Sequence, residues 1–287
     1  MTFITVMLVT FAISRLAPGT VQGDEIATSA SLADWQTLRG ENAPVTTQLA
    51  HWLTASLTFD FGRSFVDGRS VRDRVVEGLA ATVPLTAAAA LLAYGLGIPL
   101  GFVLALRNGR RLARVITFGL FALHGIPVFW TALLASLAAR RLSLPTPRGD
   151  NAIAAILAVI CLSYPGVARI ARYQRAAVLE TLDSGFVQLA RAKGLPRSIV
   201  LGRYVLGATI HAPLSLLASE LPWLLGGSVV VERVFGINGM GQLTFESILR
   251  RDLPVVMGVT ALVAGLTIVS TLLADGAYAL IDPRRRA

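Results

Sequence analysis

The sequence contains little charge and only one lysine. Of 287 residues, 15% are charged and 54% are hydrophobic, whereas a soluble domain carries about 25% charged residues. The single lysine, Lys193, is followed by Gly194. A phosphate-binding Walker A loop needs a lysine followed by serine or threonine, so this loop is missing. The composition argues against a large soluble helical protein, and the chain is not expected to hydrolyse ATP by itself.

Cysteine and histidine are also scarce. Cys161 stands alone within an apolar run, so it forms no intrachain disulfide and is most simply a small apolar filler. His51, His124 and His211 lie in different segments without the spacing of a metal site. Serine, histidine and aspartate occur without a nucleophile motif. The sequence therefore predicts no metal site, no bound cofactor and no enzyme active site.

Long hydrophobic runs are what the chain has in abundance. A hydrocarbon layer about 30 Å thick is crossed by about 20 apolar helical residues. Six runs approach or exceed this length, at residues 2–17, 79–106, 115–139, 151–168, 212–231 and 255–280. They predict an all-α, polytopic membrane protein with about six transmembrane helices and a single domain over residues 1–287. The first run lacks the basic start of a signal peptide, so we expect a permanent helix and leave open an upstream extension.

The basic residues lie between the apolar runs. Segments 107–114, 169–211 and 282–287 hold 14 of the 26 basic residues but only three of the 17 acidic residues. Nucleic-acid binding is not expected, because such surfaces form one basic stripe with interleaved aromatics. The positive-inside rule instead places these three segments in the cytoplasm. Both termini are then cytoplasmic, and residues 18–78 form a long outer segment.

Two of the ionisable residues within the apolar runs are candidates for a transport pathway. A charge at the centre of a membrane helix costs about 2.5–3.5 kcal/mol, so such residues usually face a cavity or a partner. Glu220 is predicted to face a water-filled pathway or a polar partner, with a protonated glutamate in a packed interface as an equal alternative. His124 is a second pathway candidate, although a hydrogen-bonded histidine inside the bundle is the simpler interpretation.

The cytoplasmic segment 169–211 is too long to be a plain connector. Its leucines and phenylalanine recur at helical spacing and predict one apolar helix face: Leu179, Leu182, Phe186 and Leu189. Gly194 and Pro196 predict the end of that helix, and residues 198–206 predict a second one. The tip is basic. It suits either anionic lipid, at about 1 kcal/mol per basic residue, or a soluble protein that docks on the apolar stripe.

The tip also resembles a known motif. The run Leu189-Ala190-Arg191-Ala192-Lys193-Gly194-Leu195 is similar to the short cytoplasmic motif of permease subunits in binding-protein-dependent ABC importers. The whole chain resembles the dipeptide/oligopeptide/nickel subfamily. Further matching runs follow in order: Arg15 to Gly19, Asp60 to Phe65, Gly97 to Gly101, Val229 to Glu232, Gly239 to Gly241, Arg251 to Val256 and Ile281 to Arg284. The sequence departs from the family at Ala212, near which a proline is usual, and at Pro84, where a glutamate is usual.

The resemblance implies a type I ABC importer permease in the bacterial inner membrane. The loop that contains Phe186 and residues 189–195 would dock on an ATP-binding subunit, which uses ATP and magnesium. The other implied partners are a second ATP-binding subunit, a second homologous permease, membrane lipid and a periplasmic solute-binding protein. The outer loop 232–254, through Gly236, Gly239 and Gly241, would contact that binding protein or would be a plain solvated loop.

Peptides or similar small solutes are the implied substrate, with nickel, opines and sugars left open. Two other functions are kept as alternatives. A secondary carrier would need ion-binding broken helices and usually two internal repeats, and a membrane scaffold would tolerate scrambling of residues 189–195.

Overall fold

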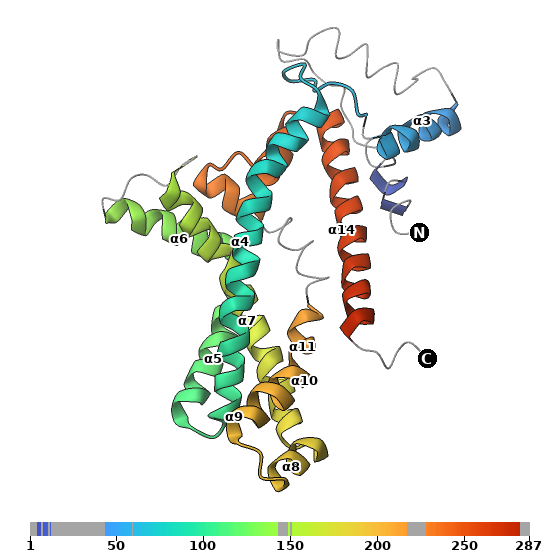
Figure 1. Ribbon diagram of the computed structural model, residues 1–287. Coiled ribbons are helices and arrows are strands. Elements are labelled where there is room, and N and C mark those ends of the chain that lie inside the picture. Colours follow the sequence, from blue (N-terminus) through green and yellow to red (C-terminus); the bar gives the residue numbers. More distant parts are fainter. Residues whose placement is uncertain are drawn as a thin grey trace.

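The computed structural model describes residues 5–6, 8–10, 12, 44–58, 60–142, 149, 151–216 and 228–281. The described chain is helical, with one isolated β-bridge between Arg63 and Ser70. The helices are α3 (Val45–Thr58), α4 (Val71–Leu106), α5 (Arg111–Gly125), α6 (Val128–Arg141), α7 (Ala152–Leu182), α8 (Gly185–Ala192), α9 (Arg197–Ile199), the π-helix η1 (Val200–Leu206), α10 (Gly207–Thr209), α11 (His211–Leu214), α13 (Met240–Leu249) and α14 (Leu253–Ile281) (Figure 1). The all-helical prediction is confirmed.

Within the described residues, two helices are long and apolar enough to cross a membrane. These are α4 and α7, and α5 with α6 makes a third if the bent pair counts as one span. Residues 253–269 of α14 form a shorter apolar stretch. Most of the predicted first run and most of the fifth lie outside the described residues.

Helices α4 and α7 pack along each other and form the long axis of the molecule (Figure 1). Small residues make this possible. A Cβ placed on Gly101 would lie 2.3 Å from the carbonyl oxygen of Ala171, and one on Gly97 would lie 2.7 Å from Cγ2 of Ile170. Since small residues let membrane helices approach closely, these glycines set the α4–α7 distance, as their clustering in the sequence predicted.

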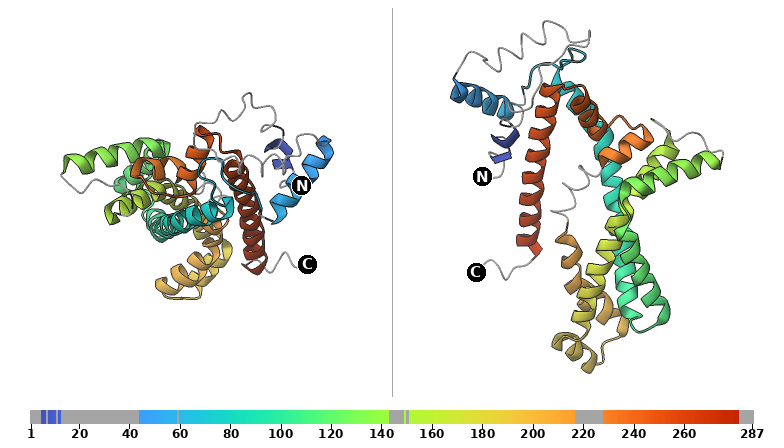
Figure 2. Two further views of the ribbon diagram at one scale, coloured as in Figure 1. Left: turned by 90° about the horizontal axis from the view of Figure 1, so that it is seen from above. Right: turned by 180° about the vertical axis from the view of Figure 1, so that it is seen from behind.

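The span predicted over residues 115–139 is broken into two helices. The chain forms α5 and α6, which are bent by 96° at a short break. Pro127 explains the break, because the residue before a proline is disfavoured in helical conformation, and Ile126 is extended with ψ 125°. The hydroxyl of Tyr164 on α7 donates to the carbonyl oxygen of Ile126 at 2.6 Å. Helix α6 therefore projects sideways from the α4–α7 axis (Figure 2).

The helix of the predicted fourth span extends into the predicted cytoplasmic loop. Helix α7 continues 14 residues past the expected end at 168 and stops at Leu182. A new helix, α8, begins at Gly185 after a short turn. The expected apolar stripe is consequently divided between two helices. The second predicted run, 198–206, is helical, but residues 200–206 adopt the wider π form.

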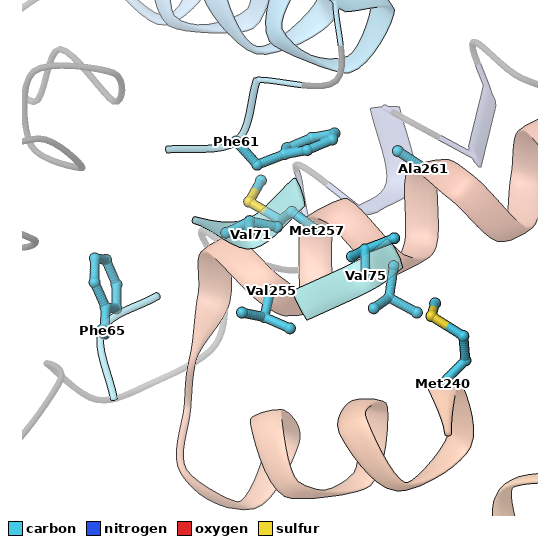
Figure 3. Packing of buried hydrophobic residues seen from close by; sticks show 9 residues of the cluster. Phe61, Phe65, Val71, Val75, Met240, Val255, Met257 and Ala261 are labelled. Carbon is cyan, nitrogen blue, oxygen red and sulfur yellow. The ribbon is translucent and has the colours of Figure 1, made fainter. Parts of the chain in front are cut away.

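A hydrophobic cluster joins the elements at the outer end of the molecule. Figure 3 shows side chains from segment 60–70, α4, α13 and α14 in contact: Phe61, Phe65, Val71, Val75, Met240, Val255, Met257 and Ala261. All are at most 5% exposed. Figures 1 and 2 show α14 close to α4 at this end, while its other end stands apart from α4. The cluster is therefore the apolar attachment of α14 to the long axis.

Candidate functional site: a docking helix and an outer loop

Helix α8 has one buried and one exposed apolar face. Val187 and Ala190 are 0% and 3% exposed, and they pack in a cluster with Ala105 of α4. On the other face, Phe186 and Leu189 are 47% and 55% exposed. Residues three apart on a helix are neighbours, so these two side chains form a single apolar patch, which we call the α8 tip.

The end of α8 is closed by the predicted glycine. Gly194 has φ +74°, a left-handed conformation that glycine adopts without steric cost. Its N–H donates to the carbonyl oxygen of Arg191 at 2.9 Å, and the N–H of Leu195 donates to that of Ala190 at 3.3 Å. These two bonds make a Schellman motif, with Lys193 as the C-cap. The motif fixes the direction in which the chain leaves α8.

Three basic side chains surround the end of α8. Arg191, Lys193 and Arg197 are exposed, and none of them forms an ion pair with another described residue. The two arginines and the partly buried Leu195 line a pocket of about 490 Å³ between α8, α9 and the last turns of α4 and α7. Ala192, the last residue of α8, is exposed too. The site thus pairs an apolar tip with unneutralised positive charge, which suits a partner that has an apolar cleft with an acidic rim.

The two pathway candidates have different outcomes. Glu220 lies outside the described residues. His124 lies at the last turn of α5 and is exposed, on the side of α5 that faces α7. There the guanidinium of Arg172 stacks 4.5 Å above the ring of Phe121. No residues between 5 and 281 that the structure describes group three or more metal-ligating side chains.

The outer loop 232–254 contains α13 and an interior carboxylate. Glu232 is 0% exposed. Its Oε2 accepts from the N–H groups of Gly241 and Gln242, at 2.8 and 3.2 Å. Its Oε1 accepts from the hydroxyl of Thr82 on α4 at 2.7 Å. Carboxylates are favoured at helix N-termini because unpaired N–H groups point outward there, so Glu232 caps α13.

The three glycines predicted as loop contacts have structural roles in this arrangement. Gly236 has φ +65° and ends the helical segment 228–235. Gly239 and Gly241 are buried. A Cβ on Gly239 would lie 2.5 Å from the carboxylate of Glu232, and one on Gly241 would lie 2.3 Å from Cα of Val229. Nearby on α13, three apolar side chains are exposed: Phe245, Ile248 and Leu249.

A second interior carboxylate lies at the other end of the outer loop. Asp252 is 0% exposed. It accepts from the hydroxyl of Ser64 at 2.5 Å and from the N–H of Phe65 at 3.1 Å, and it pairs with Arg74 at 3.1 Å. Burial raises the pKa of Asp252, and the bonds from Ser64, Phe65 and Arg74 only partly oppose this rise. The Asp252 network ties the outer segment, α4 and the start of α14 together.

Sequence reasoning did not single out Glu232 or Asp252 as functional residues. Both were noted only as members of matching runs. A usable signal was present for Glu232, because an acidic residue directly follows three valines and a charge at the end of an apolar run needs a partner. The partners of Asp252, Ser64 and Phe65, are remote in sequence, so no local sequence pattern predicts these contacts.

Comparison with known families gives a match over most of the chain. The profile of the family described as "Binding-protein-dependent transport system inner membrane component" matches residues 97–287. Among individual proteins, the chain is 34% identical over 293 residues to the oligopeptide transport system permease protein OppB of Salmonella typhimurium, covering 99% of this chain and 95% of OppB. It is 32% identical over 269 residues to the metal-staphylopine import system permease protein CntB of Staphylococcus aureus, covering 92% and 86% of the two chains.

Two solved structures share the fold. The inward-facing MetNI methionine ABC transporter matches with a TM-score of 0.63 at 20% identity, over 72% of this chain and 96% of that chain. A structure of an amino acid ABC transporter with histidines matches with a TM-score of 0.54 at 19% identity, over 74% and 94% of the two chains. The helical arrangement described above is therefore the fold of such permeases.

Proposed function

Since the chain belongs to the family of binding-protein-dependent transport system inner membrane components, we propose that the α8 tip docks it onto a separate ATP-binding subunit. The chain is a multi-pass permease component of an ABC importer in the inner membrane, and not the ATPase of that complex. Phe186 and residues 189–195 are the proposed contact residues. Membership in this family argues against the alternatives of a secondary carrier or a scaffold.

One observation carries this proposal. Phe186 and Leu189 are about half exposed on a helix whose other face is fully packed. Exposing apolar surface beside water is unfavourable, so a patch of this kind at the end of the long axis marks an interaction site. The exposed Arg191 and Lys193 add charge that an acidic partner would neutralise, and they also suit anionic headgroups of membrane lipid.

We place the docking face in the cytoplasm and the loop with α13 outside. The support is the charge asymmetry of the segments and the family match. The proposed topology has six spans within a single domain over residues 1–287, an outer segment 18–78, a coupling loop 169–211 and both termini in the cytoplasm. A second, homologous permease would complete the translocation pathway. Glu220 and His124 are proposed to face this pathway.

The outer face is the proposed contact with a periplasmic solute-binding protein. Its apolar part is the exposed set Phe245, Ile248 and Leu249 on α13. Arg233 pairs with Glu246 at 3.3 Å and stacks 5.2 Å above the Phe245 ring, which holds this aromatic side chain in place. A fixed apolar face with charged neighbours is typical of protein contacts.

Peptides or similar small solutes are the proposed cargo. This proposal is supported by the similar proteins, which include oligopeptide permeases and a metal-staphylopine permease. Loading the cognate binding protein with candidate solutes, and measuring which one it retains, distinguishes peptides from metal–opine complexes, nickel and sugars.

Co-purification tests the docking proposal. The tagged permease is expressed with its ATP-binding subunits and isolated in detergent. Phe186→Ala with Leu189→Ala should reduce ATPase recovery at least about tenfold, since each loses an interface anchor worth about 1 kcal/mol or more. Leu112→Ala is the matched control, because Leu112 is an equally apolar residue, 63% exposed, at the same end of the molecule on α5. Equal recovery from both variants would contradict the docking proposal.

A further inference from the structure

The contact between Thr82 and Glu232 joins the outer loop to the longest helix of the molecule. Thr82 is 0% exposed and its hydroxyl is used twice. It donates to Oε1 of Glu232 at 2.7 Å and accepts from the N–H of Met240 at 2.8 Å. Glu232 in turn accepts from two N–H groups at the start of α13. One hydroxyl and one carboxylate therefore connect α4, the segment 228–235 and α13.

The packing around this contact is tight. A Cβ on Gly239 would lie 2.5 Å from both Oε2 of Glu232 and Oγ1 of Thr82. A Cβ on Gly78, one turn earlier on α4, would lie 3.0 Å from Sδ of Met240 and 3.2 Å from its backbone nitrogen. The start of α13 thus lies directly on the backbone of α4, and the polar contact is shielded from water.

The opposite end of α4 reaches the docking helix. Ala105 is 2% exposed and shares a cluster with Val187 and Ala190 of α8. Between Thr82 and Ala105 the helix is continuous, with Pro84 and Pro99 inside it, and 23 residues at 1.5 Å each span about 35 Å. A single helix therefore touches the start of α13 at one end and α8 at the other (Figure 1).

We propose that the Thr82–Glu232 contact is a latch that makes the outer loop move together with α4. Motion imposed on α8 then reaches the exposed face of α13 through α4 as one body. Glu232 and Thr82 are positioning residues in this scheme, because they act through α13 and touch neither solute nor nucleotide. The inference rests on the proposed function only in assigning α8 to an ATPase and α13 to a binding protein.

A distance measurement on the purified permease tests the latch directly. Nitroxide labels are attached at two exposed sites, Leu249 on α13 and Leu91 on α4, in a variant without Cys161. Thr82→Val removes the shared hydroxyl. Loss of the two buried hydrogen bonds to Glu232 and Met240 is expected to favour the open latch at least about fivefold to tenfold, so the distribution of label distances should broaden or gain a second population.

Two variants on the same helix make the test specific. Thr86→Val is the matched control, because Thr86 is also buried but its hydroxyl bonds only to backbone oxygens of α4, at 2.8 and 3.2 Å. Thr82→Ser keeps the hydroxyl and should restore the narrow distribution. Glu232→Gln should broaden it as Thr82→Val does. A distribution for Thr82→Val that is indistinguishable from that of Thr86→Val would overturn the latch.

The assembled complex gives the functional readout. In the reconstituted importer, Thr82→Val should lower the ratio of binding-protein-stimulated to basal ATPase activity several-fold, while Thr86→Val and Thr82→Ser keep the wild-type ratio. An unchanged ratio with Thr82→Val would overturn the role in coupling. If the wild-type permease retained no ATPase at all, the proposed function would fail, yet the label distances would still decide whether the latch exists.

Discussion

The hydroxyl of Ser64 donates a hydrogen bond of 2.5 Å to Asp252, although 188 positions separate the two residues in the sequence. Both side chains are fully buried. Asp252 ends the outer loop, and Glu232, at its start, is bonded to α4 in a comparable way. Both ends of the loop are therefore fixed to α4 or its neighbours, while the exposed face of α13 lies between them.

The Asp252 network predicts a dependence of stability on pH. The folded-state pKa of Asp252 is raised above its ordinary value of 3.8, mainly by burial. A carboxyl with a raised pKa binds its proton more tightly when folded, so its contribution is complete below about pH 4 and is lost as pH rises through the folded pKa. The stability of the wild type relative to Asp252→Asn should therefore fall over that range and then level off.

Thermal unfolding in detergent at a series of pH values measures this difference. Asp60→Asn serves as the control for loss of a carboxylate, since Asp60 is exposed in the same outer segment. A wild-type advantage that grows with rising pH would mean that the ion pair with Arg74 dominates over burial.

The two faces of α8 should respond differently to truncation. Val187→Ala removes a fully buried side chain and should lower the free energy of unfolding by about 1.5–3 kcal/mol. Leu189→Ala, on the exposed face, should change it by less than about 0.5 kcal/mol while weakening ATPase binding. Melting temperature and ATPase co-purification, measured on the same two variants, separate these effects. Similar melting temperatures for both would show that α8 is not packed on α4 as described.

The α4–α7 contact should tolerate alanine at one glycine and not at another. Gly101→Ala places a methyl group 2.3 Å from a carbonyl oxygen of α7, and backbone cannot retreat as a flexible side chain can, so we expect a loss of more than about 2 kcal/mol. Gly95 lies on the same helix with nothing within 4 Å of its Cβ position. Gly95→Ala should be neutral or stabilising by about 0.5–1 kcal/mol. Detergent melting curves of the two variants provide the comparison.

The cap of α8 predicts a similar pair. Gly194 has open space around it, so Gly194→Ala costs only backbone strain, about 1–2 kcal/mol. Gly194→Asn should cost less, because asparagine tolerates the left-handed conformation. Gly185→Ala, at the start of α8 with ordinary backbone and open space, is the control and should leave both stability and ATPase retention unchanged. ATPase retention that decreases in the order Gly185→Ala, Gly194→Asn, Gly194→Ala would support the cap as the feature that orients the docking site. Equal retention in all three variants would contradict this role.

The sequence predicted the helical class from its apolar runs, and it predicted the helix end at Gly194 from Gly194 and Pro196. These features depend on local propensity, which a short window of sequence contains. The division of the apolar stripe at Asp183 and Ser184 was missed, because α7 and α8 both continue the same spacing of apolar residues across the turn. The bend before α6 lies at Pro127, and its size could not be predicted, since a proline in a membrane helix either kinks or breaks it depending on neighbouring contacts.

The polar contacts of the outer loop were beyond sequence reasoning for another reason. Thr82 and Glu232 lie 150 positions apart, and the sequence around either residue does not predict that the two are in contact. Gly239 and Gly241 were predicted as loop contacts from the resemblance to the permease family. Their burial follows from the carboxylate that they make room for, which only the folded chain reveals.

The π-helical turn at Val200–Leu206 determines how α10 and α11, which follow it, are rotated about the helix axis. A π segment accommodates one residue more than an α-helix of the same height. If these residues rewound into regular α-helix, the chain beyond would turn by about 100° and advance by about 1.5 Å. Thr209 would then leave the amide of Gln174, with which it shares a 3.0 Å hydrogen bond. The rotational position of α10 and α11 is thus determined by one surplus residue in the turn that follows α8 and α9.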